Sequence, residues 1–377
     1  MKRIPGLDGL RAVSILLVLY GHLIGTRGFY DNAALLDRIG DVANLGVRVF
    51  FVISGFLITS LLLKEVEKTG TISIKQFYRR RALRIFPAAY SFILVVTIAY
   101  LLGVCDLRHG DLLHAYTYTM NYSQARSWWM GHLWSLSVEE QFYLLWPATL
   151  LLFGVRRGMR MGIAVLILAP LVRLGTGYFW ISQRPLIGNT FQTVADTIAT
   201  GCLLAGYKND LLHRRWFRRI IDSRIFFLVP LAVLTLNLKA GGRIRWLILE
   251  TLINLLIGLC VFRVTIYPQD WAGKFLNWRP VAYVGVLSYS LYLWQQLFIN
   301  RTSNAWTERF PQNLLLAFCA ALLCHYLIEK PFLRLRDAKR VSRAVAQLKA
   351  PELVPSSAPC AGPGPAASPS QTSLMRE

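Results

Sequence analysis

Long apolar runs, separated by short polar or basic loops, recur along the whole 377-residue chain. An α-helix needs about 20 mainly apolar residues to cross a bilayer, and ten runs approach this length. They cover residues 9–25, 43–63, 84–103, 138–154, 161–180, 191–207, 225–238, 246–262, 281–299 and 312–328. The pattern therefore predicts an all-α, polytopic integral membrane protein with about ten transmembrane helices. We expect residues 1–340 to form a single transmembrane domain.

Basic residues gather in alternate loops, and this predicts how the chain is oriented in the membrane. The clusters lie within residues 64–84, 156–160, 208–224 and 330–340, whereas the opposite loops carry mixed charge. Lysine and arginine are enriched in cytoplasmic loops, so both termini are expected on the cytoplasmic side. The short loop with Lys239, Arg243 and Arg245 departs from this alternation, which we interpret as a misplaced span boundary nearby.

Composition supports the membrane interpretation and argues against two others. Charged residues make up 16% of the chain, against about 25% in ordinary soluble domains. The net charge of +22 is compatible with nucleic-acid binding, but the basic residues lie in short loops, so no nucleic-acid partner is expected. The six cysteines show no zinc-ligand or redox spacing, so no metal site is expected. Residues 341–377 are rich in proline, alanine and serine, which predicts a disordered cytoplasmic tail.

The first apolar run, DGLRAVSILLVLYGH, carries two ionisable residues, Arg11 and His22. Eleven residues at about 100° each leave the two side chains only about 20° apart on the helix, with roughly 16 Å between them along its axis. Arg11 could simply extend to the membrane surface, and His22 could simply form a hydrogen bond between helices. An ionisable group inside a span is nevertheless a candidate for function, and both interpretations stay open.

The stretch FYRRRALRIFP places four arginines just before the third span, namely Arg79, Arg80, Arg81 and Arg84. Basic residues are expected at a cytoplasmic helix end for orientation alone, which is sufficient to explain Arg79. Two arginines three residues apart at a helix start also suit bidentate phosphate binding. Arg81 and Arg84 are therefore candidate anion ligands.

The block HLWSLSVEEQFYLLWP opens the fourth span and contains two adjacent glutamates. Ser137 and Glu140 have the spacing of a capping box, in which a serine and a glutamate bond the free N–H groups at a helix start. Glu139 has no such explanation. It could orient or charge-balance the His22 imidazole, or it could be solvated at the headgroup level.

Other candidates carry weaker signals. Asp196 is an acid without a visible counter-charge near the outer end of the sixth span, and His132 is a candidate for the outer side of the site. Ser54 lacks the motif of a nucleophilic serine, so Ser54 and Gly55 are interpreted as small residues that allow close helix packing.

Taken together, these motifs resemble the acyltransferase-3 family of membrane acyltransferases. The blocks LDGLRAVSILLVLYGH, FFVISGF, FYRRRALRIFP, WSLSVEEQFYLLWP, LSYSLYLW and YLIEKPF follow in the family's order over residues 4–336. The resemblance implies about ten transmembrane helices and transfer of an acyl group, usually acetyl from acetyl-CoA, to a hydroxyl. The family's acceptors are commonly sugars of cell-surface polysaccharides, and small molecules such as macrolides in some branches.

Carried onto this chain, the family pattern matches Arg11 and His22 to its opening signature, Arg81 and Arg84 to its Arg-x-x-Arg motif, and Glu139 to its acid. Two positions depart from the pattern. Gln295 stands where the family often has histidine, and Val194 stands where an arginine often precedes the acid of ADTIATGCLLA by two residues. Both departures concern the acceptor side of the site.

The resemblance gives these residues roles. Arg11, Arg81 and Arg84 are expected to hold the phosphates of cytoplasmic acyl-CoA, the donor co-substrate, with no other cofactor bound. His22 is expected to act as general base, or less simply to accept the acyl group itself, with Glu139 orienting it. To the acceptor side we assign Asp196, together with His132 and with Tyr289 of the block LSYSLYLW.

The expected protein is a bacterial inner-membrane enzyme that contacts acyl-CoA, a glycan or other hydroxyl acceptor, and lipid. Two other readings are a proton-coupled transporter, which would also use ionisable groups inside its spans, and a non-catalytic membrane scaffold. The transporter should show inverted repeats with paired broken helices, and the sequence has none that we detect. The scaffold leaves His22 and Glu139 unexplained. The sequence does not indicate an oligomeric state.

Overall fold

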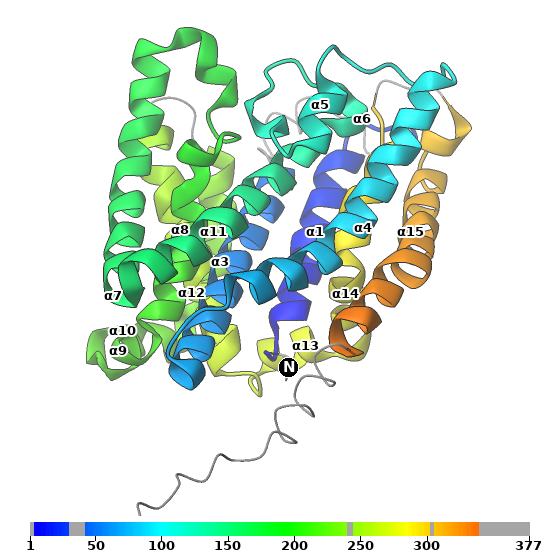
Figure 1. Ribbon diagram of the computed structural model, residues 1–377. Helices are drawn as coiled ribbons and strands as arrows, with labels where there is room; N and C mark the ends of the chain where they lie inside the picture. Colours follow the sequence, from blue (N-terminus) through cyan, green and yellow to red (C-terminus); the bar gives the residue numbers. More distant parts are fainter. Residues whose placement is uncertain (1–3, 30–41, 240–243, 302–304, 339–377) are drawn as a thin grey trace, which may run out of the picture. The chain divides into compact units, whose positions relative to one another are not determined.

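A computed structural model describes residues 4–29, 42–239, 244–301 and 305–338 of the chain. Every regular element in these ranges is a helix, as the apolar runs predicted (Figure 1). Met1–Arg334 form one compact unit and Leu335–Glu377 a second. The predicted tail, residues 341–377, lies outside the described residues and stays a prediction. Residues 240–243 also lie outside them, so the misplaced span boundary near Arg243 stays a prediction as well.

Five helices in the described ranges are long and apolar enough to cross a membrane, or six if one bent pair counts as a single span. They are Val42–Thr69 (α3), Ile74–Leu101 (α4), Trp128–Phe179 (α6 with α7), Arg245–Ile266 (η4 with α12) and Gln312–Ala338, with the pair Arg215–Ile221 and Arg224–Leu238 bent by 60°. An integral membrane protein is thus supported by helix length and composition. The number of ten spans and the cytoplasmic position of both termini stay predictions.

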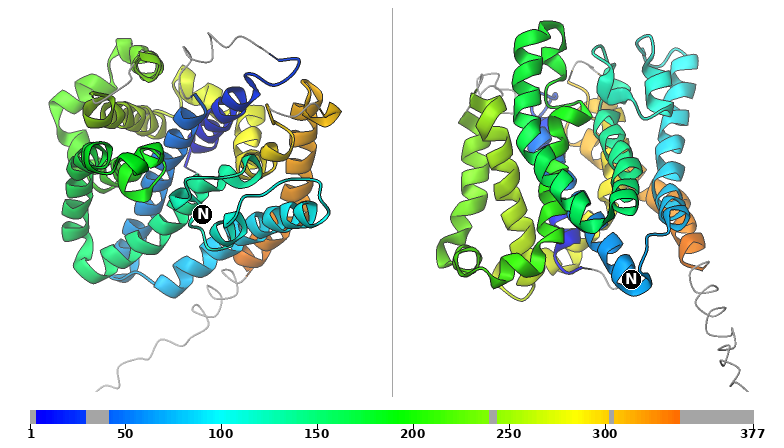
Figure 2. Two further views of the ribbon diagram at one scale, coloured as in Figure 1. Left: turned by 90° about the horizontal axis from the view of Figure 1, so that it is seen from above. Right: turned by 60° about the vertical axis from the view of Figure 1, so that its left-hand side comes forward.

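Three of the predicted spans form helices of only 16 or 17 residues: α1 (Leu7–Leu23), α8 (Phe191–Gly206) and α14 (Arg279–Trp294). They lie inside the bundle. Helix α1 packs against α3 and α14, and α8 packs against α3 and α7. Seen from above, α1 and α3 lie between a group containing α7, α8, α11 and α12 and a group containing α4, α14 and α15 (Figure 2).

The remaining helices connect or extend these elements. They include α5 (Asp111–Tyr116), α6 (Trp128–Gly131), α7 (Leu133–Phe179), α9 (Lys208–His213), α10 (Arg215–Ile221), α11 (Leu228–Lys239), α12 (Glu250–Ile266), α13 (Trp271–Asn277) and α15 (Gln312–Cys324), with the π-helical segments η4 (Arg245–Leu249) and η7 (His325–Glu329) and the 3-10 helix η5 (Gln295–Leu297). Helices α9, α10 and α13 lie at the same end of the bundle as the N-terminus (Figure 1).

Helices α3 and α8 meet backbone to backbone through two glycines. A Cβ atom placed on Gly55 would lie 2.1 Å from the carbonyl oxygen of Ile198, and one on Gly201 would lie 2.1 Å from that of Val52. No side chain fits in either place. The expectation that Gly55 allows close helix packing is confirmed, as is common in membrane bundles.

Helix α7 contains both the fourth and the fifth predicted span. Its backbone leaves the helical region at Gly154, where φ is 77° and ψ is 163°. A residue with a side chain rarely adopts this φ, so glycine permits the break. The two predicted spans, 138–154 and 161–180, are the two halves of α7 on either side of it.

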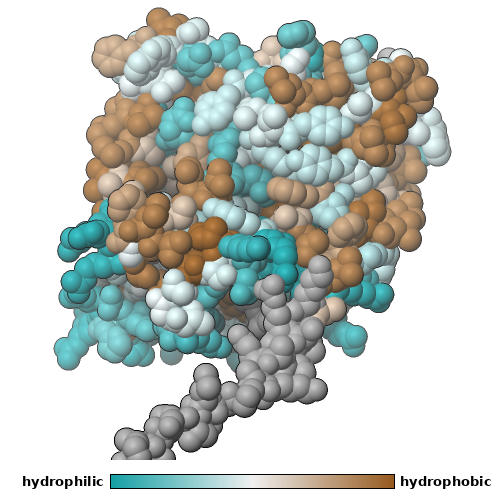
Figure 3. Space-filling view, in the orientation of Figure 1, coloured by the Kyte–Doolittle hydropathy of each residue, from teal (hydrophilic) through white to brown (hydrophobic). Residues whose placement is uncertain are grey.

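The surface supports a membrane environment. Large apolar side chains are exposed on several helices, among them Leu94, Ile98, Leu144, Leu152 and Leu323. In the space-filling view, apolar residues cover much of the upper and middle part, and hydrophilic residues gather at the lower end (Figure 3). Apolar exposure on this scale is unusual for a soluble monomer and is expected where side chains face lipid.

Candidate functional site

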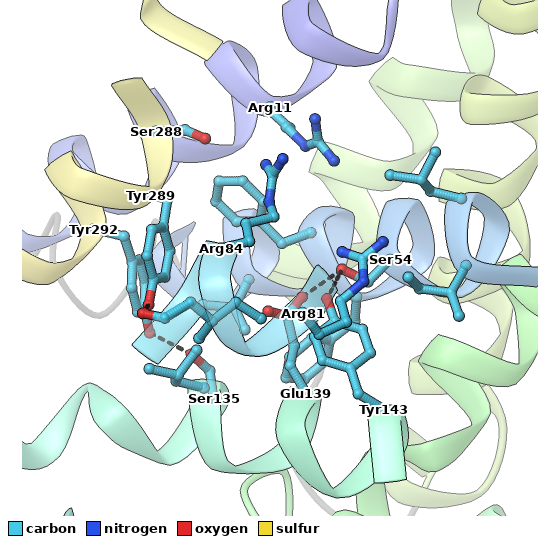
Figure 4. Close-up of a pocket in the computed structure, with 17 residues that line it drawn as sticks. Arg11, Ser54, Arg81, Arg84, Ser135, Glu139, Tyr143, Ser288, Tyr289 and Tyr292 are labelled. Atoms are coloured by element: carbon cyan, nitrogen blue, oxygen red, sulfur yellow. Dashed lines mark hydrogen bonds between the residues drawn. The ribbon is translucent and has the colours of Figure 1, made fainter. Parts of the chain in front are cut away.

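A pocket opens between α1, α3, α4, α7 and α14 (Figure 4). It encloses about 780 Å³ of space, part of which is open to solvent at its mouth. Its charged lining consists of Arg11, Arg81, Arg84 and Glu139. Four of the predicted site residues, from three helices, are therefore brought to one cavity.

Arg81 and Arg84 reach the pocket from the first third of α4. Because they are three residues apart, they share one face of the helix. The guanidinium of Arg81 lies 5.3 Å from the ring centre of Tyr143 and 5.7 Å from that of Phe77. Among the described residues, neither arginine donates a hydrogen bond or forms an ion pair. Two guanidinium groups thus line the pocket with their donors available to a ligand.

Arg11 enters the same pocket from α1. Its Nη1 donates to Oδ1 of Asp8 at 3.1 Å, one turn earlier on the helix. Figure 4 shows its guanidinium directed toward the space that Arg81 and Arg84 also face. With three arginines and one glutamate, the lining is positive overall, which favours an anionic ligand.

Glu139 lies on the α7 side of the pocket, where its carboxylate accepts a hydrogen bond from the Ser54 hydroxyl. Tyr143 in turn donates to the Ser54 oxygen at 3.3 Å. Ser54 is therefore a pocket residue that sequence reasoning missed, because a small residue beside a glycine was interpreted as packing alone. The hydrogen bond observed for Glu139 is to Ser54, and its predicted pairing with His22 stays a prediction.

The predicted capping box of Ser137 and Glu140 is wrong. Helix α7 begins at Leu133, directly after α6, so both residues lie inside the helix. Ser137 instead donates to the carbonyl oxygen of Leu133 at 2.9 Å and accepts from the N–H of Met120 at 3.2 Å.

Among the described residues, Glu140 of α7 and Tyr118 of the loop after α5 each have a buried polar atom without a hydrogen-bond partner. One carboxylate oxygen of Glu140 and the hydroxyl of Tyr118 are buried without hydrogen-bond partners in the described part of the chain. Burial, together with the Glu140 carboxylate, raises the pKa of Tyr118 in the loop after α5. The phenol therefore stays protonated and can act as a donor at any physiological pH.

His22 lies near the end of α1 that is remote from Arg11, and it does not line the pocket. Its Nδ1 lies 2.9 Å from Oε1 of Gln295, which follows α14. Its ring meets that of Trp128 edge-on, with 5.6 Å between the centres. Arg301 binds the carbonyl oxygens of Gly21 and His22 at this helix end. The described residues thus show a hydrogen bond of His22 with Gln295 and none with Glu139, and the catalytic role of Glu139 stays a prediction.

Two of the acceptor-side candidates, Tyr289 and His132, differ in whether they line the pocket. Tyr289 lines the pocket and donates to the carbonyl oxygen of Ile85 at 2.8 Å. His132 does not line it: the imidazole is 5% exposed and packs on the ring of Tyr292, with 5.4 Å between the centres. Tyr292 lines the pocket, so one aromatic ring separates His132 from the cavity.

Comparison with known proteins shows which family has this sequence pattern. A family model described as an acyltransferase domain matches residues 4–330. The chain belongs to this acyltransferase family. The resemblance read from the six sequence blocks is confirmed. All five helices that form the pocket lie within the matched residues.

Two relatives from Staphylococcus aureus show how far the similarity to this acyltransferase extends. "Putative O-acetyltransferase SACOL0978" of strain COL is 31% identical over 376 residues, covering 88% of this chain and 58% of its own length. "O-acetyltransferase OatA" of strain NCTC 8325 is 31% identical over 332 residues, covering 79% and 51%. The chain thus spans little more than half the length of these relatives. No solved structure matches it.

In this chain the acid of the ADTIATGCLLA block, Asp196, is not the uncompensated carboxylate that the sequence suggested. Both of its oxygens accept from the guanidinium of Arg173 at 3.0 Å, and Thr251 donates to Oδ2 at 2.6 Å. Asp196 is 0% exposed and Arg173 2%. The counter-charge comes from α7, a different helix, which a search along the Asp196 segment does not reveal. The premise that Asp196 lacks a counter-charge is wrong, and its assignment to the acceptor side stays a prediction.

The Arg173–Asp196 pair yields a stability prediction. Replacing Asp196 by alanine leaves a buried guanidinium without its counter-charge, and such a loss destabilises a fold by about 3–5 kcal/mol. We expect a lower thermal unfolding temperature in detergent for Asp196→Ala, and substantial recovery when Arg173→Met is added. A variant that unfolds like the wild type but does not transfer acyl groups would contradict this structural role.

The described residues contain no group of three or more histidine, cysteine, aspartate or glutamate side chains placed to hold a metal ion. Within the described part of the chain, the positive lining of the pocket by Arg11, Arg81 and Arg84 favours an anionic ligand over a metal cation.

Proposed function

We propose that this acyltransferase moves an acetyl group from cytoplasmic acetyl-CoA to a hydroxyl of a sugar in a cell-surface glycan or lipid-linked saccharide, at the bacterial inner membrane. Membership of the family supports acyl transfer. The names of the relatives, O-acetyltransferases, support acetyl as the group and oxygen as the acceptor atom. The observation that carries the donor assignment is the arginine pocket.

The pocket suits the anionic part of coenzyme A. Arg81 and Arg84 have no acceptors for their N–H groups among the described residues, and Arg11 adds a third guanidinium beside them. Planar guanidinium groups bind phosphate oxygens in bidentate fashion. Coenzyme A offers a diphosphate and a 3′-phosphate. Arg11, Arg81 and Arg84 would bind these groups, while Glu139 holds the pocket wall through Ser54.

The reactive end of the donor then has to reach His22. His22 lies eleven positions after Arg11 on helix α1, which corresponds to roughly 16 Å at 1.5 Å per residue. This span is of the order of the extended pantetheine arm. With the phosphates at the arginines, the arm runs along α1 past Tyr292 and presents the thioester near the imidazole.

At that position His22 acts as a general base. Its unprotonated nitrogen takes the proton of the acceptor hydroxyl while the hydroxyl oxygen bonds to the thioester carbonyl carbon. The tetrahedral intermediate collapses, the carbon–sulfur bond breaks, and an ester forms. The departing thiolate of coenzyme A takes up the proton from the imidazolium, so the enzyme returns to its starting state.

Binding measurements on the purified full chain in lipid nanodiscs test the donor assignment. We expect acetyl-CoA to bind, and 3′-dephospho-acetyl-CoA to bind about tenfold more weakly, because a charge-assisted contact contributes roughly 1.5–3 kcal/mol. Acetyl-pantetheine, which lacks the nucleotide phosphates, should not bind detectably. Equal affinity for all three compounds would contradict a phosphate-binding role of the pocket.

The acceptor is tested with radiolabelled acetyl-CoA and three classes of hydroxyl compound: amino-sugar oligosaccharides, lipid-linked saccharides and macrolides. Label on a saccharide that is released by mild base supports an O-acetylated sugar. Label on the macrolide alone would replace the glycan by a small molecule.

A further inference from the structure

We propose that Gln295 and Gln296, anchored to the backbone carbonyl of Trp128, fix the tautomer of His22, so that Nδ1 carries the hydrogen and Nε2 carries the lone pair. Gln295 is then a positioning residue: it acts through His22 and does not touch the reacting atoms. The inference rests on the proposed function, in which His22 is the general base.

The backbone carbonyl of Trp128 fixes the orientation of the Gln296 side-chain amide. A backbone carbonyl can only accept a hydrogen bond. The carbonyl oxygen of Trp128 lies 2.7 Å from Nε2 of Gln296, and the indole N–H of Trp128 donates to the carbonyl oxygen of Gln296 at 3.1 Å. The Gln296 amide must therefore present its nitrogen to Trp128, and this reciprocal pair ties α6 to η5.

The orientation of the Gln296 amide in turn fixes that of the Gln295 amide. With its nitrogen facing Trp128, Gln296 presents Oε1 to Nε2 of Gln295 at 3.5 Å. Gln295 then presents its own oxygen to Nδ1 of His22 at 2.9 Å. Reversing the Gln295 amide would place its oxygen against that of Gln296. An amide oxygen accepts, so Nδ1 of His22 must donate, and the lone pair of the neutral ring is on Nε2.

Burial of both glutamines makes a reversed amide energetically costly. Gln295 is 0% exposed and Gln296 is 3% exposed, so water does not compete for these amides, and a reversed amide would leave buried polar atoms unpaired. The edge-on contact with the Trp128 ring restrains the imidazole plane as well. The ring of His22 is held in both tautomer and direction.

Among the described residues, His132 and Arg301 are groups near His22 that can carry charge. His132 is close enough for its imidazole to interact electrostatically with that of His22, and the Arg301 guanidinium binds the His22 carbonyl oxygen at 3.4 Å. Neither is a hydrogen-bond acceptor for Nδ1–H. The neutral amide of Gln295 thus occupies the place that a carboxylate holds beside the histidine of a serine-protease triad, but it adds no negative charge.

Nitrogen NMR of protein labelled with ¹⁵N-histidine tests the tautomer directly. The chain has six histidines, and the signals of His22 are those that disappear in His22→Ala. In the wild type at high pH we expect a protonated Nδ1 and an unprotonated Nε2 for this residue. The opposite assignment would overturn the inference without any variant having to be active.

Kinetics provide the second test. We expect Gln295→Leu to lower kcat about tenfold, a usual size for loss of an orienting partner, with the KM for acetyl-CoA unchanged. Gln296→Leu should act in the same direction, because it frees the Gln295 amide to turn. Gln295→Glu keeps an acceptor for Nδ1–H and should retain more activity. Its carboxylate stabilises the protonated ring, so the acid limb of the kcat profile should move to higher pH.

Gln192→Leu is the matched control. Gln192 also accepts a hydrogen bond, from the exposed Tyr122 at 3.3 Å, but it is remote from His22 in the bonding network, and we expect wild-type kcat. Leucine variants of Gln295 and Gln296 that keep the wild-type rate and the wild-type tautomer would overturn the inference while the proposed function stands. Full activity of His22→Ala would instead remove the general base on which the proposed function depends.

Discussion

Replacing His22 by alanine is expected to lower kcat for acetyl transfer about 10³-fold, because general-base catalysis contributes roughly 10²–10⁴-fold. The methyl side chain cannot accept the proton of the acceptor hydroxyl. The KM for acetyl-CoA should change little, since His22 does not line the arginine pocket. Initial rates over a range of acetyl-CoA concentrations, with the variant purified in nanodiscs, separate the two constants.

The control for His22→Ala is His213→Ala. His213 lies at the end of α9, where its Nδ1 contacts the carbonyl oxygen of Asn209 at 2.7 Å, and it has no part in the proposed reaction. We expect wild-type rates from it. If His22→Ala binds acetyl-CoA and still turns over as fast as this control, the imidazole is not the base.

Replacing Arg81 and Arg84 together by glutamine is expected to raise the KM for acetyl-CoA about 100-fold. Each loses hydrogen bonds between charged partners, which contribute roughly 1.5–3 kcal/mol, or about tenfold or more per arginine. The KM for the acceptor should stay near the wild-type value, because the two arginines approach the donor only. Calorimetric titration with acetyl-CoA measures the same loss without turnover.

Two single variants sharpen this result. Arg79→Gln removes a positive charge from the same helix, but Arg79 does not line the pocket, so donor affinity should be kept. Arg84→Lys keeps the charge and loses the planar fork, so its KM should lie between those of the wild type and Arg84→Gln. A loss of affinity as large in Arg79→Gln as in Arg84→Gln would mean that only the general positive charge matters.

The pocket residues could be found from the sequence for a simple physical reason. A charged group inside an apolar run is costly unless something compensates for it, and Arg11 stands out on this ground. Arg81 and Arg84 stand out by their spacing of three residues at a helix start, and Glu139 by its place at the opening of the fourth span without a capping role. The structure places all four around one cavity. Ser54 gives no such signal, because a serine costs little in a helix.

The partners of these residues could not be predicted in the same way. His22 bonds Gln295, which is 273 residues later in the chain, and Asp196 bonds Arg173 from another helix. The periodicity of one helix tells which side chains share a face, but not which helix lies opposite. Glu139 was paired with His22 because both are ionisable, and the neutral amide that holds the ring had no reason to be noticed.

The apolar runs also do not show which helices face lipid and which are packed inside the bundle. Apolar runs predicted α1, α8 and α14 correctly as helices, yet these are only 16 or 17 residues long. They are packed inside the bundle, where other helices cover them. A hydropathy pattern measures how apolar a segment is, and does not distinguish contact with lipid from contact with protein.

The glycine contact between α3 and α8 has a consequence for how the pocket can be altered. Gly55, against the α8 backbone, is the immediate neighbour of Ser54, which lines the pocket. With backbones already touching at 55 and 201, the α3 wall cannot retreat to admit a bulkier ligand. The size of the group that the pocket admits therefore depends on side chains of α1, α4, α7 and α14, and a redesign of the pocket for a different anionic group should begin there and leave α3 untouched.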